Sequence, residues 1–189
     1  MAAARGGTIY FWREFEHPYG FLSQWYSSPF TAPPPNSPAS QDLVRFVTTE
    51  QYMMYRKAIL FNDKEIAEKI MRERTPKNQK ALGRKVANFD HKTWDQHKEG
   101  IVEDGNWYKF TANDEKNMKT LLLATEDKLL VEASPYDRIW GIGFNAANAE
   151  ANKDEWGLNL LGMALMRVRG RMKANSSKAA ESQSLDTKQ

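Results

Sequence analysis

The chain has 189 residues, of which 41% are hydrophobic and 12% aromatic, so it can bury the core of one folded domain. Its 27 basic and 24 acidic residues leave a formal charge of +3, which suits an anionic ligand but not an extended nucleic-acid groove. The chain has no cysteine, which excludes disulfides and thiol nucleophiles, and its three histidines are too scattered to predict a metal site. We therefore expect neither a metal nor a cofactor.

The two ends of the sequence predict no folded element. Residues 1–7 lack the apolar run of a signal peptide, and no stretch approaches the roughly 20 apolar residues of a membrane span. Residues 173–189 are polar and nearly free of bulky apolar side chains. We expect a flexible N-terminus, one domain over residues 8–172 and a disordered tail, in a protein of the cytoplasm or the nucleus with no membrane partner.

Apolar periodicity and helix breakers predict the elements of this domain. Strands are expected at Thr8–Trp12, Leu43–Val47 and Lys128–Ala133. Residues 31–41, with four prolines in eleven positions, predict a surface loop. Helices are expected from Thr48 or Thr49 to Phe61 and over Lys64–Glu73, Lys77–Asn88, His91–Glu103, Asp114–Ala124 and Asp154–Lys173. Many helices with a few strands that do not alternate with them predict a mostly helical α+β fold.

Glu50 and Lys57 are the first pair of residues that suit chemistry. They lie seven positions apart on one predicted helix and so share a face, two turns apart. An exposed stripe of solvated charges would also explain them. However, Tyr52, Met53 and Ile59 leave little polar surface on this helix, and burying a carboxylate or an ammonium requires a partner. Both residues are therefore candidate catalytic groups.

Residues 129–143 (LLVEASPYDRIWGIG) contain a second group of candidates. Strand alternation places Glu132 on the same face as Leu130, so a carboxylate points where a leucine points. Asp137 follows in a turn, and Trp140 can form a wall against which a base or a ribose packs. Two glycines that let a backbone approach a ligand complete the segment: Gly141 and Gly143. This combination indicates a binding or catalytic site without indicating a reaction.

Two further segments hold weaker candidates. Asn159 lies near the start of an apolar helix, where it can cap the helix or bind a ligand, and Gly162 permits close packing of that helix. The pattern alone favours capping for Asn159. The turn at residues 18–25 (PYGFLSQW) places Phe21 and Ser23 beside a glycine. Neither the glycine of this turn nor the two of Gly141-Ile142-Gly143 have the spacing of a dinucleotide-binding or nucleoside-triphosphate loop.

Taken in chain order, these motifs resemble those of the NADAR family, also called YbiA-like. The resemblance covers about Thr8 to Arg171, and the order and spacing of its short motifs make it specific. The matching residues are Phe11, Tyr19-Gly20-Phe21-Leu22-Ser23, Thr49-Glu50-Gln51-Tyr52, Lys57-Ala58, Gly83-Arg84, Trp94, Lys109-Phe110, Leu121-Leu122-Leu123-Ala124-Thr125, Leu130-Val131-Glu132, Asp137, Trp140-Gly141-Ile142-Gly143, Gly157, Asn159, Leu161-Gly162, Leu165-Met166 and Arg169.

Two features depart from the family pattern. After Ser23 the family usually has Asn-Phe, where this chain has Gln24 and Trp25, so the polar group at position 24 differs. The proline-rich loop at 31–41 is longer than that of a minimal member and can reshape one rim of a pocket.

The resemblance implies an N-glycosidase. Family members act on ribosylamino-pyrimidine phosphates of riboflavin synthesis or remove ADP-ribose from guanine. In both substrates a ribose is joined through its anomeric carbon to nitrogen, with a phosphate on its 5′ side. We expect the chain to cleave this bond in ADP-ribosylated guanine, free or in nucleic acid, with the riboflavin intermediates as the alternative. Contact with nucleic acid would be transient and made through the modified base.

The resemblance also gives these residues roles. Glu50, Glu132 and Asp137 surround the ribose, where one activates water and the others stabilise an oxocarbenium-like state. Their mutual repulsion raises at least one carboxyl pKa and supplies a general acid. Lys57 donates a proton, holds a phosphate or attacks the opened sugar as an amine. The candidate substrate-binding residues are Phe21, Ser23, Arg84, Trp94, Trp140, Gly141, Gly143, Asn159 and Gly162.

A non-catalytic module that binds ADP-ribose or a related nucleotide is the alternative from another class. Such a module needs fewer carboxylates than an enzyme, and it would bind its ligand tightly without releasing a product. A purely structural, partner-binding protein is the third possibility, but it leaves the acidic residues on apolar elements unexplained.

Overall fold

The computed structural model describes residues 7–35, 42–112 and 117–186. The expected flexible N-terminus, except Gly7, and parts of the proline-rich loop and of the helix expected at Asp114–Ala124 lie outside these residues. The described helices are α1 (Thr49–Leu60), α2 (Lys64–Arg72), α3 (Pro76–Gly83), α4 (His91–Thr111), α5 (Met118–Leu123), α6 (Ala146–Ala149) and α7 (Leu160–Asp186), with short 3-10 helices η1 (Gly20–Leu22) and η2 (Glu150–Glu155).

The strands form two small separate sheets. β1 (Thr8–Phe11) pairs in parallel with β4 (Leu129–Glu132), so that Phe11 lies opposite Glu132 at the carboxyl end of both strands. β2 (Phe30–Ala32) pairs antiparallel with β3 (Val44–Phe46). Since Thr31 and Ala32 belong to β2, the proline-rich loop begins two residues later than predicted, at Pro33. The predicted α+β class, mostly helical, is confirmed.

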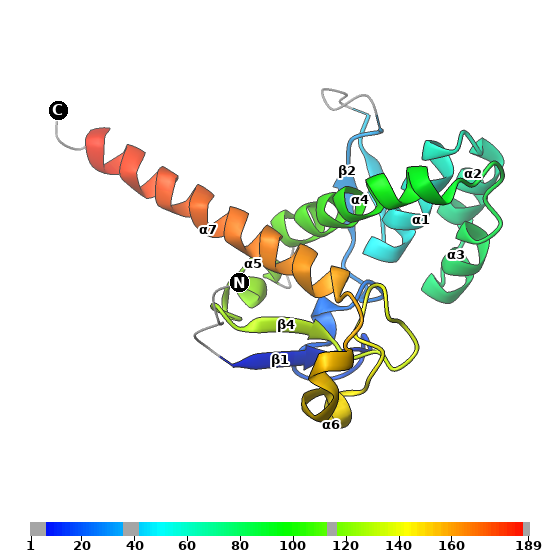
Figure 1. The fold of residues 1–189 in the computed structure, drawn as a ribbon. Helices are drawn as coiled ribbons and strands as arrows, with labels where there is room; N and C mark the ends of the chain where they lie inside the picture. Colours follow the sequence, from blue (N-terminus) through cyan, green and yellow to red (C-terminus); the bar gives the residue numbers. More distant parts are fainter. Residues whose placement is uncertain (1–6, 36–41, 113–116, 187–189) are drawn as a thin grey trace.

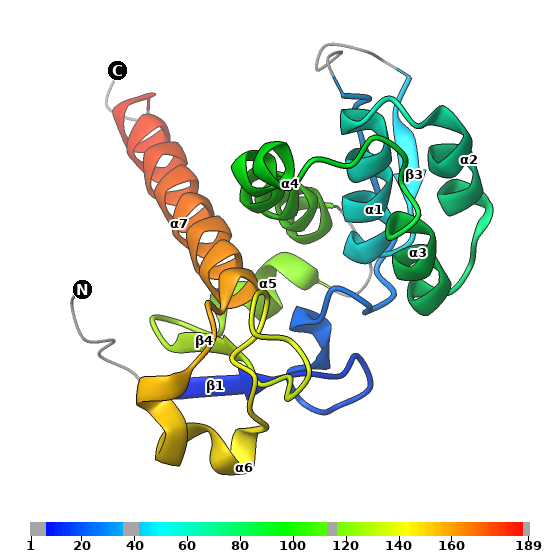
Figure 2. The same ribbon diagram turned by 45° about the vertical axis from the view of Figure 1, so that its right-hand side comes forward.

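The helices pack around α4 and α7. Helices α1, α2 and α3 form one group, and α4 packs between this group and α7 (Figures 1 and 2). The first half of α7 also packs against β4, so this helix joins the β1–β4 sheet to the helical part. One continuous apolar core runs through both parts, from Ile9 in β1 to Met172 in α7.

Several element boundaries differ from the prediction. Helix α4 continues past Glu103 to Thr111. Gly105 inside it lets the ring of Tyr52 pack closely, since a Cβ there would lie 2.7 Å from Tyr52 Cδ1. Helix α3 ends at Gly83 instead of Asn88. Helix α7 begins only at Leu160, since Asn159 before it has a φ of +50°, and residues 154–155 belong to η2.

The predicted disordered tail is the largest difference. Helix α7 continues from residue 173 through Asp186, and no glycine or proline interrupts this stretch. The absence of bulky apolar residues does not prevent a helix from continuing.

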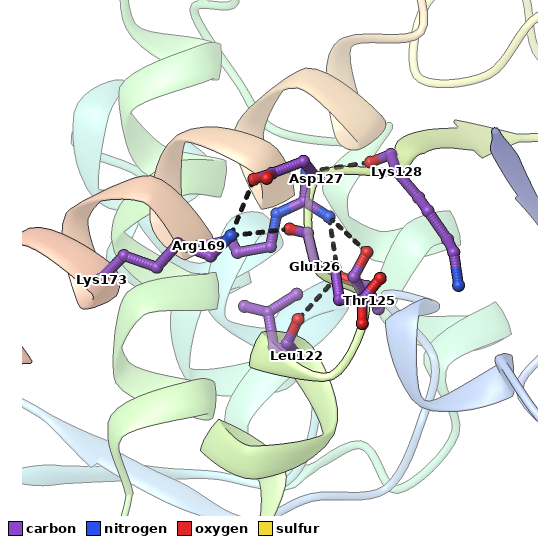
Figure 3. A network of polar contacts seen from close by, with 7 residues as sticks. All are labelled: Leu122, Thr125, Glu126, Asp127, Lys128, Arg169 and Lys173. Carbon is purple, nitrogen blue, oxygen red and sulfur yellow. Dashed lines mark hydrogen bonds and ion pairs between the residues drawn. The ribbon is translucent and has the colours of Figure 1, made fainter. Parts of the chain in front are cut away.

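A buried arginine fixes α7 to the turn that leads into β4 (Figure 3). Arg169 donates from Nη1 to Thr125 Oγ1 at 2.7 Å and from Nη2 to the carbonyl oxygen of Lys128 at 2.9 Å. One helical turn later, Lys173 Nζ lies 2.7 Å from Asp127 Oδ1. These contacts hold the start of β4 against α7.

Asn159 and Gly162 hold the carboxyl end of β4 against the start of α7. Asn159 Oδ1 accepts a hydrogen bond from the backbone N–H of Glu132, and its Nδ2 donates to the carbonyl oxygen of Leu130 at 2.9 Å. A Cβ on Gly162 would lie 2.1 Å from the same carbonyl oxygen, so only glycine allows this approach. The two residues therefore position Glu132.

We expect Gly162→Ala to lower the free energy of unfolding by about 1–3 kcal/mol, the usual cost of overpacking a rigid contact. Gly170→Ala on the same helix is the matched control, because a Cβ there meets nothing within 4 Å. It should leave stability unchanged or raise it by up to about 1 kcal/mol through helix propensity. Urea unfolding of both variants checks this expectation, and equal stability of the two would contradict it.

Candidate active site

A pocket of about 350 Å³ lies where the carboxyl ends of β1 and β4 meet α1 and α3. Residues from five parts of the chain line it: Trp12, Arg13, Glu14, Ser23, Gln24, Trp25, Glu50, Met53, Lys80, Arg84, Glu132, Ser134, Tyr136, Asp137 and Trp140. Six of the residues predicted from sequence are among them: Ser23, Arg84, Trp140 and the three acidic residues Glu50, Glu132 and Asp137. The structure thus brings together carboxyl groups that are eighty residues apart in the chain.

Glu50 enters the pocket from the first turn of α1. Thr48 caps this helix, since its side chain accepts from the backbone N–H of Gln51. Glu50 is only 4% exposed, and its Oε1 is buried without a hydrogen-bond partner among the described residues. The side chain of Trp25 is hydrogen-bonded to the carboxyl group. Burial raises the pKa of Glu50 to about 7, although Lys80, Trp25 and Arg84 act in the opposite direction.

Glu132 reaches the same pocket from the last position of β4. Its Oε2 is also buried and has no hydrogen-bond partner in the described part of the chain. Burial, followed by the negative charges of Asp137 and Glu50, raises the pKa of Glu132 to about 8, against an opposing contribution from Lys80. At neutral pH this carboxyl group is mostly protonated, so it can donate a proton.

Asp137 is held differently from the two glutamates. Its Oδ1 accepts hydrogen bonds from the backbone N–H groups of Ile139 and Trp140 at 2.9 and 2.8 Å, and its Oδ2 lies 4.0 Å from Lys80 Nζ. A Cβ on Gly141 would lie 2.7 Å from the carbonyl oxygen of Glu132, so glycine lets this turn pack against the end of β4. The turn therefore fixes Asp137 beside Glu132.

Lys109 positions a third side of the pocket. This lysine is fully buried on α4, and its Nζ donates to the carbonyl oxygens of Phe21 and Ser23 at 2.7 and 3.0 Å. These bonds hold the turn that carries Gln24 and Trp25 into the pocket. Trp25 is one of the two residues that depart from the family pattern, and the usual phenylalanine has no N–H with which to reach Glu50.

Seven of the predicted site residues do not line the pocket. Lys57 lies beyond it, with Nζ 4.1 Å from the centroid of Phe89 and 5.5 Å from that of Trp94. Phe21 packs in the core against Phe110. The backbone at Gly143, with φ +78°, turns against the side chain of Arg138. The remaining members of this group shape the backbone around Glu132, as described above: Gly141, Asn159 and Gly162.

The N-terminus of α7 is not open to an anionic group. The backbone N–H groups of Asn159, Leu160 and Leu161 donate to the carbonyl oxygens of Gly141, Ile139 and Trp140. The loop after β4 therefore caps this helix with its own backbone. A phosphate in the pocket would instead meet side chains, and the basic residues of its lining are Arg13, Lys80 and Arg84.

Sequence reasoning missed several lining residues, among them Trp12, Lys80 and Tyr136. Trp12 and Tyr136 follow the two paired strands β1 and β4, so knowledge of that pairing would have placed them together. Within the described ranges, no group of three or more histidine, aspartate or glutamate side chains is arranged to hold a metal ion. No described helix is long and apolar enough to cross a membrane.

The raised carboxyl pKa values predict how stability depends on pH. Both groups keep their proton to higher pH in the folded chain than at the ordinary value of 4.5, so stability should fall as pH rises from about 4.5 to about 8. Glu132→Gln removes one of these groups. The melting temperature of this variant relative to that of the unchanged chain should therefore be higher at about pH 8.5 than at about pH 5.

Thermal unfolding at the two pH values checks this expectation, with Glu155→Gln as the control because that side chain is exposed and outside the pocket. The melting temperature of Glu155→Gln relative to that of the unchanged chain should be the same at both pH values. A relative melting temperature of Glu132→Gln that decreases with rising pH would contradict the burial of an ionisable group at this position.

Comparison with known proteins identifies relatives. The family model described as the NADAR domain matches residues 10–173. An N-glycosidase of Acanthamoeba polyphaga mimivirus is 44% identical over 131 residues, which cover 68% of this chain and 76% of that protein. An N-glycosidase of Nostoc punctiforme is 34% identical over 162 residues, covering 86% and 90% of the two chains. The NMR structure of the E. coli protein YbiA has a TM-score of 0.68 at 26% identity and covers 90% of this chain and 87% of that one. The chain therefore belongs to the NADAR domain family.

Proposed function

We propose that this N-glycosidase hydrolyses the bond between a 5′-phosphorylated ribose and a base, and that its substrate is ADP-ribosylated guanine. The observation that carries the proposal is a pair of glutamates in one pocket, each with a buried carboxyl oxygen that has no hydrogen-bond partner among the described residues. Burial raises the pKa of both groups, to about 7 for Glu50 and about 8 for Glu132. Relatives named N-glycosidase support the reaction class. ADP-ribosylated guanine as the substrate follows from the family resemblance of the motifs.

The reaction needs one group that gives a proton and one that takes a proton. As the C–N bond breaks, its electron pair goes to the departing nitrogen, and positive charge develops on the ribose ring. A proton from an acid neutralises the leaving nitrogen, while water attacks the anomeric carbon and gives its own proton to a base. Carboxylates near the ring stabilise the positive charge that builds up on it.

We propose these roles from the groups around each glutamate: Lys80, Arg84 and Trp25 favour the ionised form of Glu50, whereas Asp137 and Glu50 disfavour that of Glu132. Glu132 holds its proton to about pH 8 and is the general acid. Glu50 has the lower value, about 7, and the contacts with Trp25 and the nearby cations favour its ionised form, so it is the base that activates water. Asp137 adds a carboxylate whose position is fixed by two backbone N–H groups and which stabilises the oxocarbenium-like ring.

The pocket also carries groups that suit the rest of the substrate. Trp140 offers an aromatic wall to the base or the ribose. Arg84 and Arg13 are exposed at the pocket and can each bind phosphate oxygens with a planar fork of donors. Ser23, which is buried at the pocket wall, accepts a hydrogen bond from the backbone N–H of Trp25 at 3.3 Å and so helps to shape this side.

The substrate is tested by offering the purified protein four compounds. These are ADP-ribosylated guanosine, the same modification in single-stranded DNA and in RNA, and a ribosylamino-pyrimidine phosphate. We expect release of ADP-ribose from the guanine-containing substrates and little reaction with the pyrimidine. Turnover of the ribosylamino-pyrimidine phosphate alone would indicate that the substrate is a riboflavin intermediate. Tight ADP-ribose binding without any product would identify a non-catalytic module.

Glu50→Gln and Glu132→Gln should each lower the rate of base release by about 10²-fold or more, because each removes one side of the acid–base pair. The loss of Glu132 should also remove the decline of rate above about pH 8, where its proton is normally lost. Single-turnover rates across pH measure both effects. The proposed mechanism is abandoned if both purified and folded variants turn over at a near-normal rate.

Lys57 does not line the pocket. Three roles are open to it: proton donor, phosphate ligand and amine nucleophile; we propose the amine. Burial, followed by the charge of Arg84, lowers its pKa, which favours the neutral amine. We expect Lys57→Met and Lys57→Arg both to lose at least about tenfold in rate, since arginine keeps the charge but has no amine to offer. Full activity of Lys57→Arg would instead assign this residue the role of a cation near the phosphate.

The remaining expectations about the setting of the protein stay predictions. We propose that nucleic acid is contacted only through the modified base, because the net charge of +3 does not provide an extended basic groove. A cytoplasmic or nuclear location is proposed from the sequence alone.

A further inference from the structure

The mouth of the pocket carries exposed aromatic side chains that the hydrolysis does not use. Among the large hydrophobic residues that are exposed in the described part of the chain, the aromatic ones are Phe15 at 66% and Tyr136 at 86%. Tyr136 lines the pocket, and Phe15 comes directly after the lining residues Arg13 and Glu14. Large exposed rings that border a pocket indicate a place for a ligand group.

These rings are held in a defined arrangement. Trp12 follows β1 and Tyr136 follows β4, and the parallel pairing of the two strands brings both rings out at one edge of the sheet. Their centroids lie 5.9 Å apart with planes inclined at 51°. The guanidinium of Arg13 lies over the Trp12 ring at 4.1 Å and 5.8 Å from the centroid of Phe15. A cation and a strongly exposed ring therefore stand side by side at the pocket mouth.

The size of the pocket shows why a substrate would need this surface. Its volume of about 350 Å³ lies at the low end of the roughly 300–1,000 Å³ typical of small-molecule sites. ADP-ribosylated guanine contains two nucleobases, two riboses and a diphosphate. A pocket at this end of the range suits the ribose of the scissile bond with its base, so we place the distal nucleoside outside, beside the lining residues.

We propose that the adenine ring of the ADP-ribosyl group stacks on Tyr136 at the rim, with Arg13 beside the diphosphate. The proposal rests on the proposed function, since it names the position of the second nucleobase of that substrate. Every nucleobase has a π-face that an aromatic side chain can stack on, so the recognition needs no hydrogen bond to the base edge. The Arg13 guanidinium, already placed by the indole, can form charge-assisted hydrogen bonds to phosphate oxygens without a large loss of side-chain freedom.

Calorimetric titration of two ligands, ADP-ribose and ribose 5-phosphate, tests this inference. Tyr136→Ala should weaken ADP-ribose binding by roughly tenfold, within the range measured for a base stacked on an aromatic side chain, and leave ribose 5-phosphate binding unchanged. Tyr136→Phe keeps the ring and should keep the affinity for ADP-ribose. Leu43→Ala, which removes an exposed apolar side chain outside the pocket, should change neither ligand.

With these two ligands, three results would overturn the proposal: no measurable binding of ADP-ribose to the unchanged chain, no effect of Tyr136→Ala, or equal weakening of both ligands. An effect confined to a modified oligonucleotide would also overturn it, because the ring would then meet a flanking nucleobase. Binding is measured without turnover, so the two proposals can fail separately. Stacking on Tyr136 without release of guanine would contradict the proposed function alone.

Discussion

Burial of Glu50 and of one carboxyl oxygen of Glu132 in the same pocket is the constraint on which this structure depends. A carboxylate without a hydrogen-bond partner is costly to bury, and a second one nearby increases the cost. Oε1 of Glu50 and Oε2 of Glu132 are in this situation. The cost is lowered in two ways: Glu132 keeps its proton to about pH 8, and the cations beside Glu50 favour its ionised form, so the pair can hold one acid and one base.

The surrounding fold serves mainly to hold these groups in place. Glu132 is the last residue of β4, and this strand is locked to α7 by Asn159 at one end and by Arg169 at the other. The turn at η1 and Ser23 is held by the buried Lys109, which allows Trp25 to contact Glu50. Because these supports come from distant parts of the sequence, the pocket exists only in the folded domain.

Site residues were easiest to predict from the sequence where a charged side chain interrupts an otherwise apolar helix or strand. Glu50 on an apolar helix and Glu132 in an apolar strand could be recognised because a carboxylate there needs a reason. Helical spacing predicted a common face for Glu50 and Lys57, but Lys57 does not line the pocket that Glu50 enters, because spacing does not tell where a pocket ends. Trp12 and Tyr136 were missed because each is ordinary in its own segment, and only the pairing of β1 with β4 brings them together.

A titration of the glutamate side chains by carbon-13 NMR tests the central claim most directly, with Glu50→Gln and Glu132→Gln used to assign the two signals. The account predicts two carboxyl resonances that titrate in coupled steps, with apparent pKa values of about 7 and about 8. If all glutamate resonances titrated near the ordinary value of 4.5, the buried acid–base pair would not exist and the mechanism built on it would be wrong.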